Sequence, residues 1–97
     1  MKAYVIAQIA VDDVDRYKPY AAQVPATIAA YGGRYLIRNG AKHALEGAPP
    51  TERIVVLEFP SLERAKEWYT SEAYQSARVI RLSASTGNLF IIEGSEE

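Results

Sequence analysis

Hydrophobic side chains near the N-terminus alternate in a pattern that predicts a β-strand over residues 3–10. One parity carries Ala3, Val5, Ala7 and Ile9, and the other carries Tyr4 and Ile6. Apolar residues on both parities are typical of a strand that is covered on both of its faces. We therefore expect a first strand with no face open to solvent.

The hydrophobic period then changes to that of an α-helix. Asp12 and Asp13 can cap its N-terminus. The apolar positions that follow at spacings of three and four are Val14, Tyr17, Ala21, Val24, Ile28 and Tyr31. Pro19 fits the first turn of the main helix after a short capping turn, whereas Pro25 predicts a kink. Gly32-Gly33 predicts a left-handed cap at the C-terminal end.

A second and a third strand are expected over residues 34–38 and 53–59. Asn39-Gly40 signals a turn, and the polar residues 41–52, with a Pro-Pro pair, predict an irregular excursion between the two strands. The third strand is apolar on both parities. Ser61 then caps a helix. Its predicted buried stripe is Leu62, Ala65, Trp68 and Tyr69.

Ser71-Glu72 predicts a fresh helix start that extends to about residue 82, and Gly87 precedes a last strand over residues 88–93. The element order is therefore βαββαβ. Right-handed crossovers place both helices on one face of a four-stranded antiparallel sheet, so the fold class is α+β, ferredoxin-like, with residues 1–97 as one domain. The other sheet face is bare and apolar, which predicts a homodimer through that face and a cleft between sheet and helices.

The composition of the chain limits the classes of binding partner that we expect. Eleven basic and twelve acidic residues give a formal net charge of −1, which lacks the positive field that nucleic acids or anionic membranes attract. No cysteine is present, which excludes thiolate chemistry and suits a cytoplasmic location. The N-terminus alternates where a signal peptide would carry an apolar block. We expect no nucleic acid and no membrane as partners.

Several spaced motifs together resemble one family. They are Ala30-Tyr31-Gly32-Gly33-Arg34-Tyr35-Leu36, Leu45-Glu46-Gly47, Val56-Leu57-Glu58-Phe59-Pro60-Ser61, Trp68-Tyr69-x-Ser71-x-x-Tyr74-Gln75 and Ile92-Glu93-Gly94. In this order they resemble domain-of-unknown-function family number 1330, in the dimeric α/β-barrel superfamily. The resemblance implies the fold and a dimer. It also relates the chain to cofactor-independent monooxygenases, lactone isomerases and haem-dependent dismutases, whose ligands occupy a cleft in each protomer.

Phenol groups and one interrupted strand supply the candidate chemistry. Seven tyrosines could hold an aromatic ligand or deliver a proton, although those on helical stripes are expected in the core. Glu58 interrupts an apolar strand and needs a cationic partner, which an arginine of the second strand can supply. Such an arginine can instead clamp an anionic substrate, or the pair can lock the dimer. The candidate ligand-binding residues are Gln8, Tyr20, Arg34, Arg38, Glu58, Tyr69 and Tyr74.

Other chemistries find little support. His43 is the single histidine and lies in the polar excursion, so we expect no metal site and no haem. Gly32-Gly33 follows a helix and lacks the Lys-Ser/Thr of a phosphate loop. We expect a protein that binds or converts a small molecule in the cleft without a tightly held cofactor. The alternatives are a non-catalytic structural or regulatory dimer and, ranked last, an RNA-binding module.

Overall fold

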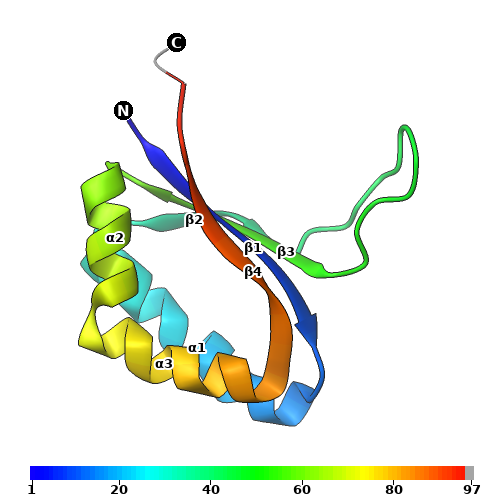
Figure 1. Cartoon of the computed structure of the whole chain (residues 1–97), viewed down its shortest axis with the longest axis horizontal. Helices are drawn as coiled ribbons and strands as arrows, with labels where there is room; N and C mark the ends of the chain where they lie inside the picture. Colours follow the sequence, from blue (N-terminus) through cyan, green and yellow to red (C-terminus); the bar gives the residue numbers. More distant parts are fainter. Residues whose placement is uncertain (96–97) are drawn as a thin grey trace.

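The computed structural model of the chain describes residues 1–95, and its elements follow the βαββαβ order with the second helical region split in two (Figure 1). The strands are β1 (Ala3–Val11), β2 (Arg34–Arg38), β3 (Arg53–Phe59) and β4 (Ser85–Glu93), and the helices are α1 (Val14–Ala30), α2 (Leu62–Thr70) and α3 (Glu72–Ala84). Within the described residues, no helix has the length and hydropathy needed to cross a membrane.

All four strands form one antiparallel sheet in the order β2-β3-β1-β4. This is the predicted ferredoxin-like topology, with β1 in the interior between β3 and β4. The pairing of β2 with β3 is irregular, because the register shifts between Tyr35 and Ile37. Such a bulge reverses the faces on which the following side chains lie.

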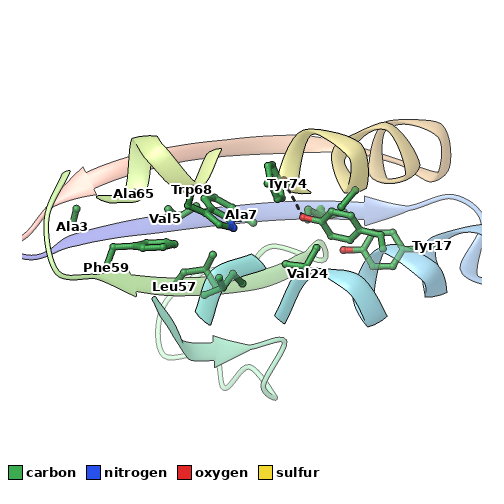
Figure 2. Packing of buried hydrophobic residues seen from close by; sticks show 14 of the residues in the cluster. Ala3, Val5, Ala7, Tyr17, Val24, Leu57, Phe59, Ala65, Trp68 and Tyr74 are labelled. Carbon is green, nitrogen blue, oxygen red and sulfur yellow. Dashed lines mark hydrogen bonds between the residues drawn. The ribbon is translucent and has the colours of Figure 1, made fainter. Parts of the chain in front are cut away.

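The helices cover one face of the sheet, and the core lies between them and that face (Figure 1). On β1 the residues of one parity are buried, namely Ala3, Val5, Ala7 and Ile9. Leu57 and Phe59 of β3 lie opposite them in register and are also buried. The largest fully buried side chains are Trp68, Tyr74, Phe59 and Ile28. Figure 2 shows Trp68, Tyr74 and Phe59 between the sheet and the helices.

The opposite face of the sheet is open. Its β1 residues Tyr4, Ile6 and Gln8 are half-buried, and Ile92 of β4 is 51% exposed. The expectation that strands are covered on both faces is therefore wrong for the isolated chain, since the helices reach only one of them. An apolar face of this kind is unusual on a soluble monomer.

Helix α1 begins as expected, since the Asp13 carboxylate accepts a hydrogen bond of 3.1 Å from the backbone N–H of Arg16. It then continues through both prolines. Pro19 is the sixth helical residue, so its predicted place in the first turn is wrong. Val14 was expected in the buried stripe but is 65% exposed, while Tyr20 is buried instead. The helix therefore turns a slightly different face to the core.

The ends of the helices follow local capping chemistry. Gly33 N–H donates to the Ile28 carbonyl and Gly32 N–H to the Ala29 carbonyl, and Gly32 has a φ of 77°, as the predicted left-handed cap requires. Ser61 and Ser71 each accept, through Oγ, an N–H bond of 3.2 Å from three residues on. The predicted restart of the helix at Ser71 is confirmed.

The last strand is longer than predicted, because α3 ends at Ala84 and β4 begins at Ser85. Gly87 lies inside this strand with a φ of 153°. A Cβ at that position would overlap the backbone carbonyl oxygen of Gln8, so only glycine lets β4 approach β1 there. Residues 39–52 form no helix or strand, as expected, and extend away from the sheet (Figure 1).

Candidate functional site

Two hollows lie between the sheet and the helices. The first, called the inner cavity below, is lined by Val5, Ala7, Ile9, Tyr17, Tyr20, Ala21, Val24, Ile28, Tyr35, Arg38, Arg53, Val55, Leu57, Trp68 and Leu89. Its free space is about 40 Å³. A water molecule needs about 10–15 Å³ by this kind of measure, so the inner cavity has room for a few waters or a small polar group.

The second hollow, called the outer groove below, lies between α2 and β4. It is lined by Val5, Lys66, Trp68, Tyr69, Thr70, Leu89, Phe90 and Ile91 and has about 320 Å³ of free space. An apolar cavity of about 150 Å³ already admits a benzene ring, so a ring-sized molecule fits. Val5, Trp68 and Leu89 line both hollows. The two hollows are thus adjacent, and together they form the cleft between sheet and helices.

Two tyrosine hydroxyls meet beside the inner cavity. The Tyr20 and Tyr74 oxygens are 3.0 Å apart, and the hydrogen bond between them is drawn in Figure 2. Tyr74 is fully buried, with its ring centroid 4.2 Å from that of Trp68. Burial raises the pKa of Tyr20, and the Tyr74 hydroxyl raises it further. The raised pKa keeps the Tyr20 phenol neutral, and either of the two hydroxyls can be the donor in the bond between them.

A second buried hydrogen-bond chain fixes the indole ring of Trp68, which lines both hollows. Trp68 Nε1 donates to Thr27 Oγ1 at 3.0 Å, and that hydroxyl donates to the Val24 carbonyl at 2.7 Å. Because a buried N–H without a partner is costly, this chain holds the indole in one orientation. The sequence interpretation missed Thr27, and its position among the buried residues of α1 was the available signal.

Glu58 lies on the open face of the sheet, away from both hollows. Arg34 Nε donates to its carboxylate at 2.9 Å, and Lys2 Nζ lies 3.4 Å from the same oxygen. The hydrogen bond from Arg34 is the main reason that the pKa of Glu58 is lowered. The expected pairing of Glu58 with an arginine of the second strand is confirmed for Arg34, and Lys2 is an additional partner.

Arg38 does not join Glu58, because the bulge in β2 places it on the helix-covered face. Its guanidinium carbon lies 4.5 Å from the Tyr35 ring centroid, and Nη2 donates to the Ala21 carbonyl at 3.4 Å. That carbonyl is four residues before Pro25, which has no N–H to occupy it. The proline in α1 thus leaves an acceptor for an arginine of the sheet.

Arg53, at the start of β3, was not among the predicted site residues. Its guanidinium carbon lies 5.5 Å from the Tyr17 ring centroid, and it lines the inner cavity together with Arg38. Burial raises the pKa of Tyr17, and the positive charge of Arg53 opposes this shift. Neither Arg53 nor Tyr17 was predicted as a site residue, because Arg53 begins a strand and Tyr17 lies on an ordinary apolar stripe of a helix.

The remaining candidates are dispersed. Gln8 lies on the open face between Ile54 and Asn88, and no side-chain hydrogen bond joins it to Glu58 within residues 1–95. Tyr69 lines the outer groove. The side chain of His43 is exposed in the excursion, and no cluster of three metal-ligating side chains occurs in the described part of the chain. The structure therefore brings Tyr20, Tyr69 and Arg38 to the cleft.

Comparison with known proteins gives a family and a fold. The family model described as domain of unknown function (DUF1330) matches residues 2–95. No curated protein matches the chain significantly. Among solved structures, the RPA0582 protein of unknown function from Rhodopseudomonas palustris is similar with a TM-score of 0.75 and 14% identity, covering 99% of this chain and 84% of that one.

Two further structures resemble this chain over almost its whole length. SnoaB, a cofactor-independent oxygenase from Streptomyces nogalater, has a TM-score of 0.65 and 10% identity, covering 99% of this chain and 95% of its own. A dimeric ferredoxin-like protein of unknown function from Jannaschia sp. CCS1 has a TM-score of 0.69 and 12% identity, covering 98% and 99%. Identities this low establish the shared fold alone.

The buried tyrosine pair yields a thermodynamic prediction. Tyr20→Phe and Tyr74→Phe each leave the other tyrosine's hydroxyl without its hydrogen-bond partner. Each should therefore lower the free energy of unfolding by about 1–2 kcal/mol. The double variant has no hydroxyl left unpaired. Its loss of unfolding free energy should therefore be smaller than the sum of the two single losses by at least about 0.5 kcal/mol. Urea unfolding measures all three. Tyr4→Phe on the open face is the control and should be nearly neutral; strictly additive losses would contradict a direct hydroxyl contact.

The pH dependence of stability should report on Glu58. Its pKa is lowered in the folded state from an ordinary value of 4.5, so its contribution is complete above that value and is lost as the pH falls towards the folded pKa. Between about pH 5 and 3, wild type should therefore lose more stability than Glu58→Gln in urea unfolding. Glu46→Gln in the exposed excursion should follow wild type. Equal pH slopes for Glu58→Gln and wild type would show that the ion pair is not formed in solution.

Proposed function

The chain belongs to the DUF1330 family of domains of unknown function, and from this premise we propose that it binds or converts a small molecule in the cleft between sheet and helices. It does so as a cytoplasmic homodimer and without a tightly bound cofactor. The ligand is an aromatic or anionic molecule. The observation that supports this proposal most directly is the outer groove, with about 320 Å³ of free space, next to the inner cavity.

The walls of the cleft suit a flat apolar body. Trp68 and Tyr69 present adjacent rings whose centroids are 6.4 Å apart, and Leu89 and Ile91 provide an aliphatic wall on β4. Lys66 is the charged residue of the groove. Because the two rings are inclined at 62° to each other, a planar ligand that stacks on one of them meets the other at an angle, and both contacts are favourable for aromatic groups. SnoaB, which shares the fold at low identity, is a cofactor-independent oxygenase, so this fold can support a reaction without a cofactor.

Binding is better supported than conversion. The side chains that line the two hollows include no Asp, Glu or His within residues 1–95. The Tyr17, Tyr20 and Tyr35 phenols line the inner cavity, and burial raises the pKa of each. A general base needs a pKa near the working pH, and these phenols lie far above it. A non-catalytic dimer is therefore the second candidate function.

The open sheet face supports the homodimer. Ile37 of β2 and both Phe90 and Ile92 of β4 are exposed there, around the half-buried Ile6 and Val56 of the two interior strands. A second copy stacked on this face would remove that apolar surface from water, and two-fold association is the commonest way to do so. The Jannaschia protein, which has the same fold, is dimeric.

Trp68 offers a direct test of ligand binding, because it is the single tryptophan and lines both hollows. Titration with phenol, indole and 1,4-naphthoquinone should change its fluorescence emission for at least one compound. Methyl NMR signals of Val5 and Leu89 should shift in the same titration. Thr70→Phe narrows the outer groove and should weaken binding about tenfold, the effect of about 1.4 kcal/mol.

Thr51→Phe, in the exposed excursion, is the matched control and should bind as wild type does. Native mass spectrometry of freshly purified protein adds any molecule retained through purification. The proposal fails if no compound alters Trp68, or if the shifted signals lie outside both hollows. If a bound compound is recovered chemically unchanged after incubation with the protein, the result would favour a binding protein over an enzyme.

The dimer predicts a mass change on substitution at the open face. Ile92→Lys places a charge in the proposed interface, where its desolvation is costly, and should convert the dimer to monomer at micromolar concentration. Light scattering after size-exclusion chromatography measures this. Val79→Lys, on the exposed side of α3, should leave the mass unchanged. A monomeric wild type, or a dimeric Ile92→Lys protein, would show that this face is not the dimer interface.

A further inference from the structure

The inner cavity carries two arginines without a counter-charge. Arg38 is exposed and Arg53 half-buried, and both line it. Neither forms an ion pair with a carboxylate within residues 1–95, where their guanidinium groups contact the rings of Tyr35 and Tyr17 and one backbone carbonyl. Arg34 of the same strand shows the contrast, since Glu58 neutralises it on the open face. Among the described residues, the positive charges of Arg38 and Arg53 therefore have no ion-pair partner.

The register fixes the distance between these two arginines. Arg38 lies opposite Val55, and Arg53 is two residues before Val55 on β3, so both side chains project from the same face as diagonal neighbours. Diagonal neighbours on paired antiparallel strands are about 7–8 Å apart. This separation lets two guanidinium groups reach one carboxylate from opposite sides.

A third arginine adds to the same field. Arg81 of α3 is only 6% exposed, and its Nε makes no hydrogen bond within the described residues. Its charge acts on Tyr17 and Tyr20, whose rings line the inner cavity. A buried N–H without a hydrogen-bond partner is unfavourable, and an anion close to this guanidinium group would be stabilised by its charge.

We propose that the inner cavity binds the carboxylate of an organic acid, with Arg38 and Arg53 holding its two oxygens and its apolar body directed past Val5, Trp68 and Leu89 towards the outer groove. This inference rests on the proposed function, because it assigns the chemical class of ligand to the same cleft. The sizes of the two hollows fit this arrangement of the ligand, because about 40 Å³ in the inner cavity suits a carboxylate and about 320 Å³ in the outer groove suits a ring.

Two probes of nearly the same shape, one anionic and one neutral, test it, namely 4-phenylbutanoate and its amide. Calorimetric titration and Trp68 fluorescence should show that wild type binds the acid at least about tenfold more tightly than the amide. Arg38→Gln and Arg53→Gln should each weaken acid binding about tenfold and leave amide binding unchanged. Arg38→Lys, which retains the charge, should recover part of the affinity.

Arg34→Gln is the matched control, because it removes the same charge from the same strand on the opposite face. Its preference for the acid should equal that of wild type, and urea unfolding of each variant confirms that it is folded. If acid and amide bind equally and still shift the Val5 and Leu89 methyls, the carboxylate site is overturned and the cleft stands. If neither these probes nor the uncharged ring compounds bind, both proposals fail.

Discussion

The covering of only one face of the sheet is the constraint on which the rest of this structure depends. A four-stranded antiparallel sheet with two right-handed crossovers places its helices on one side. Val5 and Leu57 therefore enter a core while Tyr4 and Glu58, one residue away, do not. The chain thus presents two different surfaces, a cleft beneath the helices and an apolar face that a second copy can cover.

The bulge in β2 is the small irregularity that distributes the charges between these surfaces. In a regular strand Arg34 and Arg38 would project from the same face, four residues apart. The register shift between Tyr35 and Ile37 reverses the second of them. One arginine then neutralises Glu58 on the open face, and the other lines the inner cavity, where Pro25 has left the Ala21 carbonyl free to accept its N–H.

The sequence predicted the fold well because its determinants are local. Hydrophobic period, the serine caps at Ser61 and Ser71 and the glycines after α1 each act within a few residues. The site was predicted less well because its determinants are not local. Parity alone placed Arg38 with Glu58, and no local signal joins Trp68 to Thr27 across 41 positions. The exposed Val14 and buried Tyr20 similarly depend on how α1 is rotated on the sheet.

The chemistry of the cleft follows from what surrounds its polar groups. Burial raises the pKa of Tyr20, so its phenol stays neutral, and its hydroxyl already forms a structural hydrogen bond with Tyr74. Arg38 and Arg53 have the opposite character, because a guanidinium group carries a fixed positive charge and neither of them has a carboxylate partner within the described residues. A cleft with fixed cations, neutral phenols and an apolar groove is suited to holding an anion in place. Among the described residues, the lining of the inner cavity includes no Asp, Glu or His, and the raised pKa values of its three phenols make them poor general bases at neutral pH.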